Sequence, residues 1–177
     1  YMNTCKIIDC LSTPRPLAAA LFAASFGILV FVYISQYVFH YDPCPLCLWQ
    51  RKPYFVVLAL SLFAFIVADK KSCCARMALA GCGLAFVTGM GISGFHTGVE
   101  MGWWKGLQAC GDASLPDSGD IEALREYLLN RKVVRCDVPI WQFLGLSMTM
   151  YNFITSTILA AGTFFLLYKG CKKSCAN

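Results

Sequence analysis

The chain has 177 residues, of which 58% are hydrophobic and 14% are charged, and its net charge is +5 at pH 7. A soluble domain usually contains about 25% charged residues, so this chain has too few polar side chains to cover a soluble surface. The composition excludes an ordinary cytosolic enzyme, a disordered tail and a nucleic-acid-binding module. It leaves an integral membrane protein, which we expect to be a single domain over residues 1–177.

Four apolar stretches are long enough to cross a bilayer as helices, which takes about 20 residues each. The first has 23 residues, longer than the apolar core of a signal peptide, so we expect a retained anchor. The second is apolar only from Pro53 onwards, and its helix is expected to begin earlier, near Pro45. The sequence therefore predicts an all-α bundle of four transmembrane helices at about residues 17–39, 45–68, 77–95 and 145–168, with outer loops at 40–52 and 96–144.

Lysine and arginine indicate the orientation, because they are concentrated on the cytoplasmic side of membrane spans. The segments 1–16, 69–76 and 169–177 hold eight basic residues in 33 positions, whereas the two loops hold seven in 62. We therefore place both termini in the cytoplasm and both loops outside. All four tryptophans lie in or beside these outer loops, as expected for aromatic residues at a membrane interface.

The longer loop contains one predicted short helix. Asp120 can cap a helix over Ile121 to Asn130, in which Ile121, Leu124 and Leu128 share one face. An amphipathic helix lying on the membrane surface fits this pattern. A helix packed against its own loop fits equally well.

The cysteines divide by side of the membrane. Outward cysteines in a bacterium meet an oxidising compartment, whereas inward cysteines are kept reduced. The four outward ones allow three pairings, of which one disulfide per loop is the simplest; they are Cys44, Cys47, Cys110 and Cys136. The six inward ones are expected to be reduced; they are Cys5, Cys10, Cys73, Cys74, Cys171 and Cys175. The remaining cysteine, Cys82, lies inside the third span.

The two outer pairs differ in what a disulfide would contribute. A Cys110–Cys136 bridge closes a long loop and would contribute roughly 3–4 kcal/mol of stability in the chain-entropy model. A Cys44–Cys47 bridge closes almost no loop, so a Cys-x-x-Cys pair of this kind indicates redox or metal chemistry. Zinc held by all four cysteines is the metal alternative, but the second pair lacks the usual ligand spacing. We expect no metal.

The segment from Cys44 to Arg51 has the features of a reactive site. Pro45 suits the first position of a helix, which makes Cys44 the N-cap. Cys47 then lies in the first turn, where free backbone N–H groups favour a thiolate, and Arg51 follows four residues later on the same face. We therefore predict a lowered pKa for Cys47, because the Arg51 guanidinium would also stabilise its thiolate.

Two alternatives remain open for this segment. Pro53 disfavours helix at the residue before it, so the helix either begins at Pro45 and contains Pro53, or begins near Pro53. In the second case Cys44 and Cys47 lie in a turn. Arg51 is either part of the reactive site or an interfacial anchor that extends to the lipid headgroups. We assign no role to Gln50.

The sequence from Cys44 to Arg51, Cys-Pro-Leu-Cys-Leu-Trp-Gln-Arg, resembles the DsbB (disulfide bond formation protein B) family where it opens the second span. Cys110 and Cys136 in the next outer loop also resemble that family, as does the segment from Trp141 to Met148, Trp-Gln-Phe-Leu-Gly-Leu-Ser-Met. The resemblance covers residues 17–168. It implies a thiol:quinone oxidoreductase of the bacterial inner membrane, with the redox loops in the periplasm.

The resemblance also implies roles for individual residues. A DsbA-like periplasmic protein with a thioredoxin fold is the expected partner, and its thiolate attacks Cys110 of a Cys110–Cys136 bridge. Electrons then pass to Cys44 and Cys47. Cys47 faces a diffusible membrane quinone, either ubiquinone or menaquinone, and Arg51 steadies a quinone oxygen. The only other expected contacts are with the bilayer; no nucleic acid is expected.

The third span carries two weaker indications. His96 closes it and is implied to contact the quinone, although a histidine at the end of a span is usually an interfacial residue. Small residues recur every four positions, which favours close helix packing. Admission of a flat quinone ring is a second use for this stripe, which consists of Gly81, Ala85, Gly89 and Ser93.

Two other functions compete with the oxidoreductase. One is a four-span scaffold whose outer disulfides are purely structural. The other is a relay similar to vitamin K epoxide reductase, which usually presents its Cys-x-x-Cys pair late in the bundle. Here the pair opens the second span, which makes this alternative the weaker one.

Overall fold

The computed structural model describes residues 12–106, 135–139 and 141–176. Its four helices are each long and apolar enough to cross a membrane, the last of them through Lys172. They are α2 (Pro14–Tyr37), α3 (Pro45–Val67), α4 (Ser72–Glu100) and α6 (Met148–Ala176). The prediction of an all-α protein with four spans is confirmed. The short helix expected at 121–130 lies outside the described residues.

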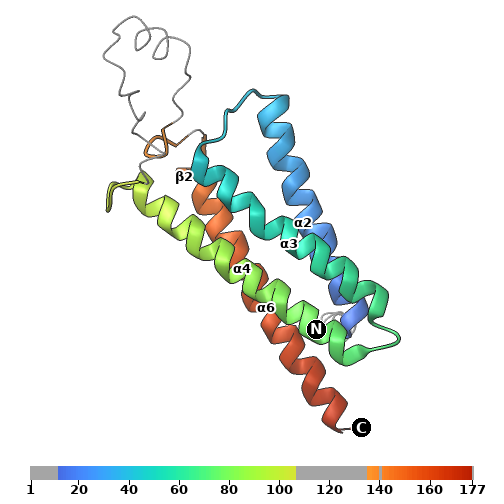
Figure 1. Cartoon of the computed structure of the whole chain (residues 1–177). Helices are drawn as coiled ribbons and strands as arrows, with labels where there is room; N and C mark the ends of the chain where they lie inside the picture. The colour runs from blue at the N-terminus through green and yellow to red at the C-terminus, as the bar shows by residue number, and fades with distance from the viewer. Residues whose placement is uncertain (1–11, 107–134, 140, 177) are drawn as a thin grey trace, which may run out of the picture.

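Helix α4 is at the centre of the bundle. It packs along both α3 and α6, while α2 packs along α3 and makes few contacts with α6. Figure 1 shows that α2 begins and α6 ends at the same end of the bundle as the α3–α4 connection. At that end Arg15 pairs with Asp69, and the Arg76 guanidinium donates to the Gly170 carbonyl at 3.2 Å. The basic segments assigned to the cytoplasm therefore lie together.

Small residues let α4 approach its neighbours closely. A Cβ atom added at Gly81 would lie 3.1 Å from Cδ1 of Leu60 on α3. One added at Gly89 would lie 3.5 Å from both Pro53 and Ser156. The interpretation of the small-residue stripe as a packing surface is confirmed at these two positions, where side-chain atoms of α3 and α6 occupy the space that a larger residue would need.

Helix α3 begins at Pro45 and contains Pro53 in its interior. This decides between the two predicted starts. Because proline has a fixed φ and lacks an N–H group, Pro45 fits the first turn, where that group would have no partner within the helix. Cys44 and Arg51 are consequently held by one continuous helix.

Helix α4 is longer than the predicted span. Residues 96–100 were expected in the outer loop, but they continue the helix to Glu100. The apolar pattern stops at Phe95, but Glu100 beyond it finds partners at the start of α6: Ser147, just before that helix, donates to Glu100 at 2.5 Å, and Thr149, in its first turn, donates at 2.7 Å. Paired polar groups can be buried in a helix that hydropathy alone would end earlier.

A short hairpin sets the start of α6. Strands β1 (Gln142–Phe143) and β2 (Leu146–Ser147) pair antiparallel around Leu144 and Gly145, which both have positive φ, as in a type I′ turn. The hydroxyl of Ser147 then accepts from the Met150 N–H at 3.3 Å, which caps α6. The helix therefore begins at Met148 rather than at 145 as predicted.

Candidate functional site

Cys44 is the N-cap of α3, as predicted. Its backbone is extended and its sulfur accepts the Cys47 N–H at 3.2 Å. The two sulfur atoms lie 2.8 Å apart in a hydrogen bond, and both residues are free thiols. A Cys44–Cys47 disulfide, which the simplest pairing predicted, is therefore absent from this state. Cys44 itself is almost fully buried.

The stabilised thiolate belongs to Cys44. The hydrogen bond with the Cys47 thiol is the main cause that lowers the pKa of Cys44 from 9.0 to about 5, against the opposing effect of burial, with smaller contributions from His96 and the Cys47 N–H. The prediction that Cys47 is the favoured thiolate is wrong. The Cys47 thiol gives its hydrogen to the Cys44 sulfur, so the negative charge is stabilised on Cys44, and the Cys47 N–H bond to this N-cap sulfur adds a smaller effect.

His96 lies beside Cys44 from α4. The imidazole is 2% exposed, and its Nε2 atom lies 3.6 Å from the Cys44 sulfur and 3.9 Å from a carboxylate oxygen of Glu100. On the other side of the ring, Nδ1 lies 2.9 Å from the side-chain nitrogen of Gln50. His96 is thus a buried partner of the reactive sulfur, whereas the sequence left an interfacial position open.

Arg51 is also buried, with 9% of its surface exposed. Its guanidinium donates to the side-chain oxygen of Gln36 at 2.7 Å and lies over the ring of Tyr33, 5.1 Å from the centroid. Its Nε atom has no hydrogen-bond partner among the described residues. A buried guanidinium held by α2 does not fit an anchor extending to the lipid headgroups, and its free donor is available to a ligand.

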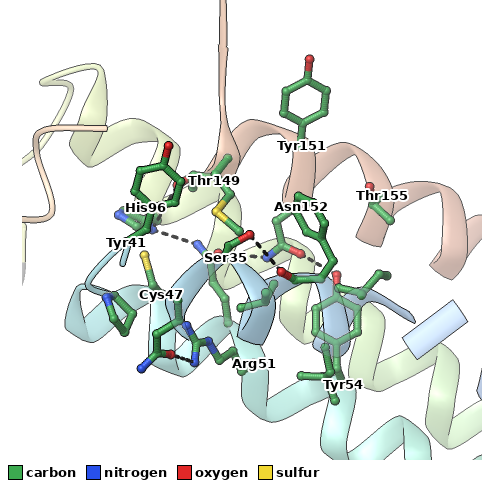
Figure 2. A pocket seen from close by; sticks show the side chains of 18 of the residues that line it. Ser35, Tyr41, Cys47, Arg51, Tyr54, His96, Thr149, Tyr151, Asn152 and Thr155 are labelled. Carbon is green, nitrogen blue, oxygen red and sulfur yellow. Dashed lines mark hydrogen bonds between the residues drawn. The ribbon is translucent and has the colours of Figure 1, made fainter. Parts of the chain in front are cut away.

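A cavity of about 510 Å³ connects these side chains. One wall is an apolar face of α2, with Ala23, Gly27, Ile28, Phe31 and Val32. One end of the cavity is polar and lies against the Cys-x-x-Cys segment. This polar end is lined by Cys44, Cys47, Gln50, Arg51 and His96. Figure 2 shows Cys47, Arg51, His96 and Asn152 around this end. Residues 81, 85, 89 and 93 do not line the cavity, so the suggestion that this stripe admits a quinone ring is not supported.

Cys136 approaches the same group of side chains. Its sulfur, the Cys44 sulfur and a ring nitrogen of His96 all lie within 4.8 Å of one another. Cys136 is disulfide-bonded, so its sulfur is not a thiolate ligand for zinc in this state. Cys110, its predicted partner, lies outside the described residues.

Comparison with known proteins identifies the family. The family model described as Disulfide bond formation protein DsbB matches residues 14–166. The chain belongs to the DsbB family. Its relatives include Disulfide bond formation protein B of Xanthomonas campestris pv. campestris (strain 8004), 31% identical over 85% of this chain and 87% of the relative. The protein of that name from Herminiimonas arsenicoxydans is 26% identical over 92% and 99%.

An uncharacterised protein of Rickettsia prowazekii (strain Madrid E) is 28% identical over 82% of this chain and 83% of its own length. No solved structure matches the chain. Membership of the DsbB family makes the chain a multi-pass membrane protein of disulfide bond formation, in agreement with the four spans and with the clustered cysteines.

The structure adds site residues that sequence reasoning did not find. Gln50 contacts His96, Asn152 contacts Gln50, and Glu100 is held beside His96 by Ser147 and Thr149. Polar residues inside otherwise apolar spans are a general signal of function. Gln50 and Asn152 carried that signal, but which residues they pair with depends on contacts between helices.

Proposed function

We propose that this DsbB-family protein is a thiol:quinone oxidoreductase of the bacterial inner membrane, which acts as one membrane domain. It re-oxidises a DsbA-like periplasmic protein and passes the electrons to a membrane quinone. The observation that carries the proposal is the position of Cys44: its sulfur lies within 4.8 Å of Cys136 and of His96, and it borders a cavity with an apolar wall.

The first half of the relay is thiol–disulfide exchange. A thiolate of the reduced partner attacks Cys110 of a Cys110–Cys136 disulfide and releases Cys136 as a thiolate. The second thiol of the partner then attacks its own sulfur in the mixed disulfide, so the partner leaves oxidised and Cys110 and Cys136 are reduced. Two electrons have entered the protein, and each step exchanges one sulfur–sulfur bond for another.

The second half passes these electrons to Cys44 and Cys47. When those two cysteines form a disulfide, the Cys136 thiolate attacks Cys44 and releases Cys47. Cys110 then attacks Cys136, which restores the Cys110–Cys136 bridge and leaves Cys44 and Cys47 as a dithiol. The proximity of the Cys136 and Cys44 sulfurs supports attack at Cys44, because exchange needs contact between the attacking and attacked atoms.

The cavity fits a quinone in shape and in polarity. Its apolar wall along α2 suits the ring and the isoprenoid tail, and the Nε–H of Arg51, which has no partner in the part of the chain that the structure describes, is a donor for a carbonyl oxygen. Gln36 and Tyr33 hold the guanidinium in place, so this donor is already oriented. A bound quinone supplies a two-electron acceptor. Cys44 and Cys47 give up two electrons and the one proton of the Cys47 thiol as their disulfide forms, and the second proton that quinol formation needs comes from water.

The thiolate of Cys44 makes the Cys44–Cys47 pair a strong oxidant. Stabilising the reduced form of a dithiol raises its reduction potential, and the reduced form here contains a thiolate with a pKa of about 5. Such a pair can take electrons from an oxidising partner, and only a stronger acceptor, such as a quinone, can remove them again. The basic residues at the opposite end of the bundle support an orientation with Cys44 towards the periplasm.

The test follows quinone reduction by the purified protein in detergent, with a reduced DsbA-like protein as electron donor and a short-chain ubiquinone as acceptor. We expect quinol formation, which needs both thiols and is lost in Cys47→Ser, and a visible absorption band on mixing quinone with the reduced protein, which is lost in Cys44→Ser because Cys44 supplies the thiolate. Cys171→Ser, which removes an exposed cysteine at the other end of the bundle, should retain both. If Cys44→Ser lowers stability but leaves partner re-oxidation intact, the disulfides are structural and the protein is a scaffold.

A trapping experiment tests the order of the relay. A partner protein that lacks its resolving cysteine should accumulate as a mixed disulfide on Cys110, which mass spectrometry locates. Accumulation on Cys44 would instead show that the partner enters at the second pair and would reverse the proposed order.

A further inference from the structure

A line of side-chain hydrogen bonds from three helices ends at the reactive sulfur. It begins on α6, passes to α3 and back to α6, returns to α3, reaches α4, and ends at the N-cap of α3. Figure 2 labels Tyr54, Asn152 and His96 of this line. In order, its members are Ser156, Tyr54, Asn152, Gln50, His96 and Cys44. Each hydrogen bond in the line joins residues that are at least 46 positions apart in the sequence, so only the packing of the bundle brings them together.

The hydrogen bonds in this line all have the same direction. The Tyr54 hydroxyl donates its single hydrogen to the side-chain oxygen of Asn152 at 2.5 Å, so Ser156, at 3.1 Å, must donate to Tyr54. The amide nitrogen of Asn152 donates to the Gln50 oxygen at 3.0 Å. This leaves the amide nitrogen of Gln50 facing His96, with its oxygen already engaged.

The direction of the line selects the tautomer of His96. Because Gln50 donates at 2.9 Å, Nδ1 must accept, and the ring hydrogen is on Nε2. The surroundings of Nε2 agree, since it faces two acceptors: the Cys44 sulfur at 3.6 Å and a Glu100 oxygen at 3.9 Å. A hydrogen on Nδ1 would point at an amide N–H group, which is a repulsive contact.

Thr149 is the only other neighbour of Nδ1 among the described contacts. Its hydroxyl oxygen lies 3.4 Å from Nδ1, and its own hydrogen is donated to Glu100 at 2.7 Å. Thr149 could therefore accept a hydrogen from Nδ1, but at a longer distance than the Gln50 contact. The shorter bond and the two acceptors at Nε2 both favour the same tautomer.

We propose that Gln50, Asn152 and Tyr54 are positioning residues that hold His96 in the Nε2–H tautomer and thereby aim a hydrogen-bond donor at Cys44. They act on the sulfur only through the imidazole. By donating to Nδ1, the neutral Gln50 side chain leaves the hydrogen of a neutral imidazole on Nε2. His96 can then donate to Cys44 without carrying a full positive charge. The proposal rests on the proposed redox role of Cys44 for its consequence, but the tautomer can be measured without any quinone.

Other charged and titratable groups act at the same place. Cys47 contacts Cys44 from α3, Glu100 faces His96 from α4, and Cys136 lies within 4.8 Å of Cys44. The cavity is also lined by Tyr41, Arg51, Tyr54, Arg135 and Tyr151. The test must therefore report on His96 itself, and substitutions in the line must leave these groups unchanged.

The tautomer is measured by nuclear magnetic resonance on the full chain with ¹⁵N-labelled histidine. The chain has only two histidines, so a His40→Gln variant assigns the signals. We expect Nε2 of His96 to bear the hydrogen and Nδ1 to show the shift of an accepting nitrogen. A hydrogen on Nδ1 in the unsubstituted chain would overturn the proposal.

Substitution tests the effect on the sulfur. In Gln50→Leu and in Asn152→Leu we expect a mixture of tautomers and a roughly tenfold loss of thiolate stabilisation. The reduction potential of the Cys44–Cys47 pair, measured in glutathione buffers, should then fall by about 30 mV. Gln50→Glu, which has the same size but adds a charged acceptor at Nδ1, should give a doubly protonated ring and a higher potential.

Tyr54→Phe provides a milder test with a matched control. Removal of its hydroxyl should shift the potential in the same direction as Gln50→Leu but less, because the remaining bonds persist. Tyr37→Phe removes the same atom from an exposed ring and should change nothing. If Gln50→Leu does not fold, Gln50→Glu and Tyr54→Phe still decide the matter. If the His96 tautomer and the reduction potential are unchanged in both Gln50→Glu and Tyr54→Phe, the proposal is refuted. If the unsubstituted protein has the expected tautomer but does not reduce quinone, only the proposed function is refuted.

Discussion

Replacing Cys47 should shift the ionisation of Cys44. In the structure the pKa of Cys44 is about 5 rather than 9.0, which means that at pH 7 about 99% of this sulfur is ionised instead of about 1%. The hydrogen bond from the Cys47 thiol, with the sulfurs 2.8 Å apart, is the largest cause. Cys47→Ala removes this donor but keeps the backbone N–H at 3.2 Å.

A hydrogen bond to a charged group is worth about 1.5–3 kcal/mol, and one pKa unit corresponds to about 1.4 kcal/mol. Cys47→Ala should therefore raise the pKa of Cys44 by about one to two units. Cys47→Ser retains a hydroxyl donor of similar position, so its pKa should stay close to that of the unsubstituted chain. Comparing the two variants separates the hydrogen bond from the loss of a sulfur atom.

The assay is the ultraviolet absorbance of the thiolate as a function of pH, corrected by subtracting the same titration of Cys44→Ser. A single alkylation rate would be misleading. Lowering the pKa by four units raises the thiolate fraction at pH 7 about 100-fold, but it lowers the nucleophilicity of the thiolate by a comparable factor. A midpoint near 9 in the unsubstituted chain, or equal midpoints in Cys47→Ala and Cys47→Ser, would refute the reasoning.

Three further predictions concern the potential, the cavity and the packing. Because Cys44 with a pKa of about 5 is largely a thiolate above about pH 6, reduction of the Cys44–Cys47 disulfide takes up one proton rather than two. The reduction potential should therefore fall by about 30 mV per pH unit between pH 6 and 8, in place of roughly 59 mV, as equilibration with glutathione buffers will show. Arg51→Ala should raise the apparent KM for quinone about 10- to 100-fold, the loss of a charged hydrogen bond, and unchanged quinone kinetics would remove Arg51 from the site. Gly83→Ala should destabilise the bundle by about 1–3 kcal/mol in detergent unfolding, because the added Cβ meets the Phe164 ring at 2.7 Å, whereas Gly91→Ala on the same helix, where nothing lies within 4 Å, should be neutral or stabilising.

Features set by spacing along one helix were predictable from the sequence. Local rules offered the N-cap at Cys44, the helix start at Pro45 and the placement of Arg51 with Cys47 together as one of two alternatives, and the structure has this one. The sequence prediction placed the thiolate on the wrong cysteine. It considered the effect of the helix dipole on Cys47 and overlooked the hydrogen bond from Cys47, in the first turn, to the sulfur of the N-cap residue Cys44.

Features that depend on contacts between helices could not be predicted. The Gln50–Asn152 hydrogen bond joins residues 102 positions apart, and the buried position of His96 depends on Gln50 and on Glu100. The end of α4 was missed for the same reason, since Glu100 is stabilised by Ser147 of β2 and Thr149 of α6. Hydropathy reports how apolar a residue is, and it carries no information about which polar groups will satisfy one another.

The small number of contacts between α2 and α6 has a consequence for how an apolar ligand would reach the cavity. The two helices touch at few points, and the cavity lies between them, with open space beside Gly27. On the proposed function, this contact between α2 and α6 is where a quinone dissolved among the lipid tails would enter and leave the cavity, without crossing water. Exchange of the proposed quinone and quinol would then proceed from the bilayer, whereas the proposed soluble partner reaches the protein from the aqueous side.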